Sequence, residues 1–174
     1  ISAGLTVKAR AFDGVNWSAL TEATFTIAAP AGPSNLRIVE IHYNPPATPG
    51  VGDAQNLEFI ELLNPSGQAV SLDGVQITEF DNTPYSFPAG MTLGAGERIV
   101  VPKNTTVFQS IYGGSILLAP GGYGSANLSN GGERVALVGP GGEIQNFIFD
   151  DAAGWPTAAD GQGSSLEIID PMGD

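Results

Sequence analysis

The chain has 174 residues, no cysteine, and 18 acidic against 6 basic residues, for a formal net charge of −12. This length suits one hydrophobic core with room for a piece of a second domain, and the acidic balance argues against binding a phosphate backbone. Without cysteine there are no disulfides, thiolate nucleophiles or thiolate metal sites, and no apolar run approaches the roughly 20 residues that span a bilayer.

The first predicted element is a β-hairpin. Residues 5–12 alternate apolar and polar side chains, residues 19–27 are rich in β-forming residues, and DGVNWS between them supplies turn residues. Residues 28–34 read AAPAGPS, a composition typical of interdomain linkers. We therefore predict that residues 1–27 are the C-terminal hairpin of a truncated upstream β domain, that 28–34 are a linker, and that 35–174 form the main domain.

A lone hairpin is at best marginally stable in water. We therefore expect the hairpin to pack on the main domain or to pair with a second copy of the chain, which would make a dimer through the hairpin.

Short predicted strands then follow one another about every ten residues, with glycine and proline between them. They fall near residues 36–43, 57–64, 70–80, 85–87, 97–102, 115–119, 134–139, 143–150 and 165–169. This spacing favours an antiparallel sandwich or barrel. Only residues 104–113 have room for a helical turn, with Gly113 available to end it. The predicted fold class is all-β.

The order of several segments resembles the lamin tail domain family, an immunoglobulin-like sandwich found in nuclear lamins and in many bacterial multidomain proteins. The segments are IVEIHYNP, EFIELLNP, VSLDGVQI, LGAGERIVV, LSNGGERVAL and WPTAADGQGSSLE, and the resemblance covers roughly residues 35–170. It implies an immunoglobulin-like antiparallel β-sandwich with one short helical turn. The preceding hairpin is weakly similar to the end of a fibronectin-like or chitobiase-type C-terminal module.

The resemblance implies a binding or assembly module without enzymatic activity. We expect a non-catalytic module of a larger exported bacterial protein, extracellular or in the cell envelope, that contacts a protein, the envelope or a cell-surface glycan. An accessory carbohydrate-binding domain of a hydrolase is the alternative, and a hydrolytic enzyme a weaker one. Lamin tails that engage chromatin need a basic surface, so nucleic-acid binding is not expected of this acidic chain.

Two carboxylates, Glu40 and Glu61, are candidate buried acids because they lie within apolar strands. Alternation places Glu61 on the face of Phe59 and Leu63, and Glu58 on the opposite face. A carboxylate on an apolar face needs a partner. If the strands are neighbours, the two acids approach each other, and one pKa rises or a cation binds.

The interpretation that we favour is simpler, with an arginine neutralising each acid. The candidate arginines are Arg37, Arg98 and Arg134. His42 is the only histidine, and the chain has no G-x-S-x-G motif, so a nucleophilic triad is not indicated. Hydrolysis by Glu40, Glu61 or His42 stays a weak hypothesis, and we interpret His42 as structural.

Calcium is the one cofactor for which the sequence offers ligands. The candidates are Asp150, Asp151 and Asp160 around the turn at residue 155, and, in a second loop, Glu79, Asp81 and Asn82. Carboxylate and amide oxygens suit calcium, but neither loop has the D-x-[DN]-x-[DN]-G pattern. Asp160 can equally form an Asp-Gly turn before the last strand.

Two tyrosines, Tyr85 and Tyr123, lie in or beside predicted loops. An aromatic ring at such a place can stack on a sugar and face a ligand. Each ring can equally cover the end of the sandwich. For Trp155, next to a proline in the family pattern, we expect packing.

Overall fold

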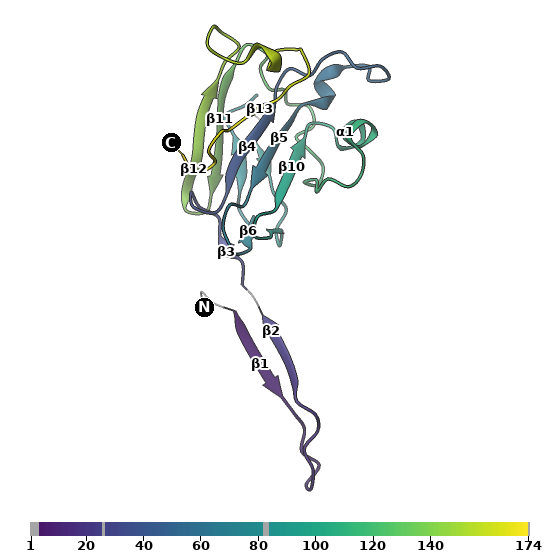
Figure 1. Ribbon diagram of the computed structural model, residues 1–174, viewed down its shortest axis with the longest axis vertical. Coiled ribbons are helices and arrows are strands. Elements are labelled where there is room, and N and C mark those ends of the chain that lie inside the picture. Colours follow the sequence, from purple (N-terminus) through teal and green to yellow (C-terminus); the bar gives the residue numbers. More distant parts are fainter. Residues whose placement is uncertain (1–3, 26, 82–83, 174) are drawn as a thin grey trace.

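The computed structural model describes residues 4–25, 27–81 and 84–173. Two four-stranded sheets and a small three-stranded sheet form a β-sandwich, from one end of which a β-hairpin extends (Figure 1). The all-β, immunoglobulin-like sandwich predicted from the sequence is confirmed.

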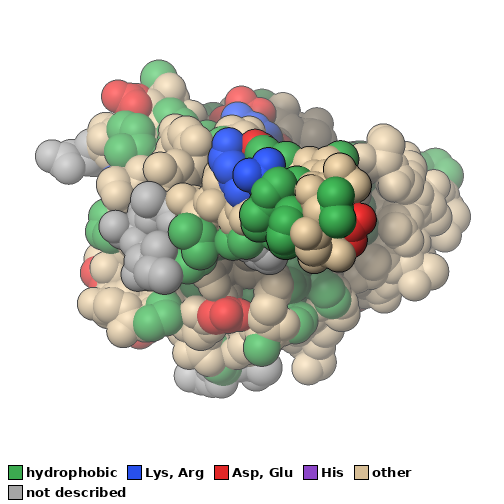
Figure 2. Space-filling view, turned by 90° about the horizontal axis from the view of Figure 1, so that it is seen from below, with side chains coloured by type: hydrophobic (Ala, Val, Ile, Leu, Met, Phe, Trp, Pro, Cys, Tyr) green, Lys and Arg blue, Asp and Glu red, His purple; other side chains and the backbone are tan. Residues whose placement is uncertain are grey.

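The hairpin consists of β1 (Leu5–Ala9) and β2 (Thr21–Phe25), which pair antiparallel. Every residue of β1 is exposed, and the hairpin points away from the sandwich (Figure 1). The expectation that it packs on the main domain of its own chain is therefore wrong, because no described part of the sandwich forms a second layer over β1. Seen from the hairpin end, hydrophobic side chains lie at the surface beside Lys and Arg side chains (Figure 2).

The first sheet of the sandwich is β10 (Arg98–Pro102), β5 (Phe59–Leu63), β4 (Arg37–His42) and β13 (Leu166–Glu167), in that order. The second is β12 (Gly142–Phe149), β11 (Glu133–Gly139), β7 (Gln76–Thr78) and β8 (Tyr85–Ser86). The third is β3 (Ala29–Pro30), β6 (Val70–Ser71) and β9 (Thr92–Leu93). All these pairs are antiparallel except β3 with β6.

Three local expectations are corrected. Residues 28–34 are not a free linker, because β3 pairs with β6 and Ala31 is buried in the core. The segment 70–80 is split by a turn in which Gly74 has φ of +71°, a conformation that suits glycine. Residues 115–119 make an isolated bridge from Leu118 to Val100 instead of a strand.

The main core lies between the two large sheets. Its fully buried side chains include Leu36, Ile60, Leu62, Ile77, Ile99 and Leu137. A smaller cluster of Phe59, Val100 and Phe108 lies on the other face of the first sheet, where the Phe59 and Phe108 rings meet edge to face with centroids 5.6 Å apart. The sandwich thus buries apolar side chains on both faces of β5.

The helix α1 (Thr105–Tyr112) brings Phe108 to this second cluster. The Asn104 side chain caps it by accepting from the Val107 amide at 3.1 Å, and Gly113 ends it with φ of +84°. The predicted helical turn is confirmed. Two short 3-10 helices, η1 (Ala54–Leu57) and η2 (Thr157–Ala159), complete the elements. None of the described helices combines the length and apolar character needed to cross a bilayer.

A β-bulge in β4 changes which side chains face the core. Ile38 pairs with Leu62 and Glu40 with Glu61, so Val39 is an extra residue between these pairs. Simple alternation placed His42 on the face of Ile38. Because of the bulge, Ile41 takes the core position, and Glu40 and His42 turn to the other face.

Candidate functional site

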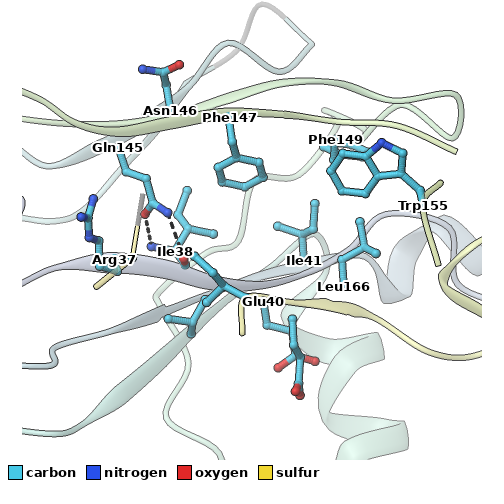
Figure 3. Close-up of a pocket in the computed structure, with 14 residues that line it drawn as sticks. Arg37, Ile38, Glu40, Ile41, Gln145, Asn146, Phe147, Phe149, Trp155 and Leu166 are labelled. Carbon is cyan, nitrogen blue, oxygen red and sulfur yellow. Dashed lines mark hydrogen bonds between the residues drawn. The ribbon is translucent and has the colours of Figure 1, made fainter. Parts of the chain in front are cut away.

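A groove of about 450 Å³ opens between the two large sheets, where β12 faces β4 and β13 (Figure 3). Its apolar lining includes Ile38, Ile41, Phe147, Phe149, Trp155 and Leu166. Its polar lining includes Arg37, Glu40, Gln145, Asn146 and Glu167. The groove is therefore an apolar cavity bordered by polar and charged groups.

Alternation along β12 sends Phe147 and Phe149 into the space between the sheets, whereas Asn146 points away (Figure 3). The pairing of β12 with β11 shifts register between Leu137 and Val138. The shift allows Ile144 to be buried even though the adjacent Gln145 also points into the groove. Alternation itself places the Gln145 amide on the same face as Phe147 and Phe149, next to the apolar lining, and Ile144 is the extra residue of the bulge.

The side-chain amide of Gln145 connects the two sheets, because it forms hydrogen bonds with the backbone of β4 as a neighbouring strand would. The Ile38 amide donates to Gln145 Oε1 at 2.8 Å, and Gln145 Nε2 donates to the Ile38 carbonyl at 3.3 Å. The last backbone bond from the β13 side runs from the Ile168 amide to the Val39 carbonyl at 2.9 Å. Beyond that point the glutamine amide completes the hydrogen bonds of β4 and closes one end of the groove.

The segment after β12 lines the remaining side of the groove with Trp155, Leu166 and the residues that follow Leu166. Its position is set by Asp160, whose Oδ1 accepts from Asn44 Nδ2 at 2.7 Å, while the Gly161 amide donates to the Asn44 carbonyl at 3.0 Å. Trp155 keeps 38% of its surface exposed, so it is open to a ligand beyond the packing that we expected of it.

Two of the three aspartates proposed as calcium ligands serve the local fold, and the third, Asp151, is exposed. Asp160 holds Asn44, and Asp150 Oδ1 accepts from the Ala152 amide at 2.9 Å. In the second loop, Asp81 Oδ2 accepts from the Asn127 amide at 3.0 Å, and Asn82 lies outside the described residues. In the part of the chain that the structure describes, no three His, Asp or Glu side chains form a group suited to a metal ion.

The structure brings Glu40 and Glu61 together as cross-strand neighbours. Glu61 forms an ion pair with Arg98, as in the interpretation that we favoured. Ser165 Oγ instead donates to Glu40 Oε1 at 2.5 Å. Burial raises the pKa of Glu40, the Ser165 hydrogen bond opposes this, and the negative charge of Glu61 adds to it.

The fully buried carboxylate is Glu58, which sequence reasoning did not select. Its Oε2 accepts from the Leu128 amide at 2.9 Å and from the Tyr123 hydroxyl at 3.2 Å. Burial raises its pKa to about 7, against the opposing effects of the Leu128 hydrogen bond and the positive charge of Lys103. The available signal was its position on the same strand face as Ile60 and Leu62, the face that forms the core.

Glu58 is one of three carboxylates that hold consecutive backbone amides of one loop. The amides of residues 127, 128 and 129 donate to Asp81, Glu58 and Glu133, at 3.0, 2.9 and 2.7 Å respectively. Part of the acidic content of this chain is therefore structural, since it satisfies amides of the segment before β11.

Both candidate ligand-facing tyrosines are buried, which corrects the prediction. The Tyr85 hydroxyl donates to the Pro120 carbonyl at 3.0 Å, and the Tyr123 hydroxyl donates to Glu58. Their rings pack edge to face on Phe87 and Phe80. Tyr85 begins β8 and Tyr123 lies on a loop, but both rings pack onto the core, and each hydroxyl finds its hydrogen-bond partner inside the fold.

His42 is also buried, with its ring 5.4 Å from that of Phe59 in an edge-to-face contact. Burial lowers its pKa, so the neutral imidazole is favoured. It does not line the groove. These contacts are those of a packed side chain, in line with the structural interpretation.

Among known proteins, the family model described as Lamin Tail Domain matches residues 29–150. No curated protein and no solved structure gives a match. The matched region contains most strands of the sandwich, including β12, while Trp155 and β13 lie after its end. Since the match covers more than half of the chain, and the strands form the immunoglobulin-like sandwich of that family, this chain belongs to the lamin tail domain family.

Proposed function

We propose that this chain is a non-catalytic interaction module whose groove takes an extended segment of a partner protein. The observation that carries the proposal is the apolar groove between β12 and β13, each the outermost strand of its sheet. An outermost strand has unpaired backbone groups, and an extended peptide can add to it. The family resemblance supports a setting within a larger exported protein.

The lining of the groove indicates the chemistry of the partner. A peptide strand added beside β12 would direct every second side chain toward Phe147 and Trp155, so apolar side chains suit these positions. Glu40 and Glu167 are cross-strand neighbours on the outer face of the first sheet, and Glu40 points away from the groove (Figure 3). Arg37 is engaged with the Ile144 carbonyl at 3.3 Å. Basic residues flanking the apolar ones would complement the net charge of −12.

The roles of the titratable groups support a non-catalytic function. Glu61 is paired with Arg98, Glu58 holds a loop, and the His42 ring packs on Phe59. Of the residues in the hydrolytic hypothesis, Glu40 alone lines the groove, and Ser165 bonds to it. Glu167, the other carboxylate of the lining, neighbours Glu40 in the same sheet, so among the described residues no second carboxylate or base lies across the groove for general acid and base catalysis.

A glycan is the second candidate ligand, and Trp155 is the observation that favours it. Its partly exposed ring lies beside Phe149 at one end of the groove (Figure 3). An exposed aromatic face suits a sugar ring, so the two candidates share one site and are distinguished by experiment.

The test is selection from a displayed library of random heptapeptides, using the whole chain as bait, with an oligosaccharide array in parallel. We expect enrichment of apolar sequences flanked by Lys or Arg, and a loss of about tenfold in affinity for Trp155→Ala. The matched control is Ile169→Ala, which removes a fully exposed side chain outside the groove and should bind as the wild type does.

If oligosaccharides bind and Trp155→Ala weakens that binding by about tenfold, the ligand of the groove is a glycan and the peptide proposal is overturned. Selection of no peptide, or of peptides that bind Trp155→Ala as well as the wild type, would overturn the proposed function.

A further inference from the structure

Lys103 is the one lysine of residues 28–174, and it is buried. Only 6% of its surface is exposed, and the loop of residues 121–124 packs against it, with the Gly124 amide donating to the Lys103 carbonyl at 3.0 Å. A buried ammonium group is normally neutralised by a carboxylate. Among the described residues Lys103 forms no ion pair, and its Nζ donates instead to Asn127 Oδ1, which belongs to a neutral amide. The charge of Lys103 is therefore costly in the folded state.

The buried carboxylate of Glu58 lies at the same place. Lys103 and Glu58 are cross-strand neighbours just outside β10 and β5, since the Lys103 amide donates to the Glu58 carbonyl at 2.9 Å. Glu58 Oε2 accepts from the amide of Leu128, the residue after Asn127. Glu58 Oε1 is buried and has no hydrogen-bond partner in the described part of the chain. Glu58, Lys103 and Asn127 thus form one buried cluster in which a carboxylate oxygen is unoccupied.

These three side chains have the chemistry required to form an amide bond within the protein. A deprotonated lysine is a nucleophile, and Asn127 Cγ is bonded directly to the oxygen that Lys103 contacts. Burial disfavours the charged forms of both an amine and an acid, so it promotes proton transfer from one to the other. Burial also raises the pKa of Glu58 to about 7, so this carboxylate accepts a proton more readily than an exposed one does.

We propose that the side chains of Lys103 and Asn127 join in a covalent isopeptide bond, with Glu58 carrying the protons. Lys103 Nζ gives a proton to Glu58, and its lone pair attacks Asn127 Cγ. Glu58 passes this proton to Asn127 Nδ2, the Cγ–Nδ2 bond breaks with its electron pair on nitrogen, and ammonia leaves. Glu58 then takes one more proton from the new amide nitrogen and ends as a neutral acid. The reaction consumes no oxidant and no second substrate, and the inference does not depend on the groove.

The bond would fasten the two sheets of the sandwich to each other. It joins the end of β10, in the first sheet, to the segment that leads into β11, in the second. It closes a loop of residues 103–127 in a chain that has no cysteine for a disulfide. By the loop-closure entropy that applies to disulfides, such a cross-link lowers the equilibrium constant of unfolding by roughly two orders of magnitude.

The mass of the whole denatured chain tests the proposal. We expect the wild type to be lighter than its sequence by one molecule of ammonia. Trypsin should leave residues 99–134 as one peptide, because it does not cleave after an acylated lysine. Lys103→Arg, which keeps the charge without the amine, and Asn127→Ala should have the full mass of their sequences. The matched control is Lys8→Arg at the exposed lysine, which should lose ammonia as the wild type does.

A wild type of full mass would overturn the proposal, and this result does not depend on any variant folding. So would a loss of ammonia that persists in Lys103→Arg, because it would come from another amide, such as that of Asn130 before Gly131. Glu58→Gln cannot take the proton, so its reaction should be about a hundredfold slower. If Glu58→Gln loses ammonia as fast as the wild type, the role assigned to Glu58 is wrong.

Discussion

β1 and β5 are both five-residue strands paired antiparallel to their neighbours, but their surroundings differ. All of β1 is exposed, while Phe59, Ile60 and Leu62 of β5 are buried, on both faces of the sheet. Alternation of apolar and polar side chains is enough for a segment to form a strand that pairs with a neighbouring strand. Stability comes from the layers above and below, which β5 has and β1 lacks.

Removing apolar volume tests this contrast most strongly. Leu62→Ala should lower the free energy of unfolding by about 2 to 5 kcal/mol, because it leaves a cavity in a fully buried site. Leu5→Ala in the hairpin should lower it by less than about 0.5 kcal/mol. Urea denaturation followed by tryptophan fluorescence and circular dichroism measures both. Similar losses for the two variants would show that the hairpin is buried in solution.

The buried carboxylate makes the sandwich sensitive to pH in a way that exposed acids do not. The pKa of Glu58 is raised from 4.5 to about 7 in the folded state, so the folded state holds this proton more tightly than the unfolded state. The resulting stabilisation is complete below pH 4.5 and is lost as the pH rises through about 7. The loss amounts to about 3 kcal/mol.

Glu58→Gln keeps an acceptor for the Leu128 amide and removes the titration. We expect the wild type to lose stability relative to this variant between pH 4.5 and 8, as measured by urea midpoints. Glu143→Gln, at an exposed acid paired with Arg134, is the control and should follow the wild type. Parallel pH curves for wild type and Glu58→Gln would contradict the assignment.

The cap of α1 offers a smaller effect within the sandwich. Asn104→Ala removes the acceptor of the Val107 amide and should cost about 1 kcal/mol of unfolding free energy. Asn104→Asp retains an acceptor at this position and should stay close to the wild type. If both variants unfold at the same urea concentration, the cap does not contribute as the structure indicates.

The smallest effect is expected at the ion pair of the hairpin. Lys8 and Glu22 are both largely exposed, so Lys8→Gln should change the unfolding free energy of the chain by less than about 0.5 kcal/mol. Hydrogen exchange should nevertheless show that the amides of β1 exchange far faster than those of β5 in both proteins. Comparable protection of the two strands would remove the contrast between the regions.

Much of the fold was predictable because its signals are local. The alternation of LRIVEIH and EFIELL predicted β4 and β5, and Asn104 and Gly113 frame the helix that was expected. The candidate site was largely missed. The groove joins Gln145 to Ile38, which is 107 residues away, and takes Trp155 and Leu166 from the last segment. The periodicity of a single strand does not predict which distant segments of the chain will lie next to it.

The sequence by itself determined the strand-rich class, the helix, the hairpin and the acidity, because these depend on neighbouring residues and on composition. Only the tertiary structure decided which face of each strand is the core. A period of two defines two faces without saying which is covered, and the bulge at Val39 exchanges them within one strand. For that reason Glu58 is fully buried while Glu40 and Glu61 are partly exposed. The inward positions of Tyr85 and Tyr123 were likewise decided by tertiary packing.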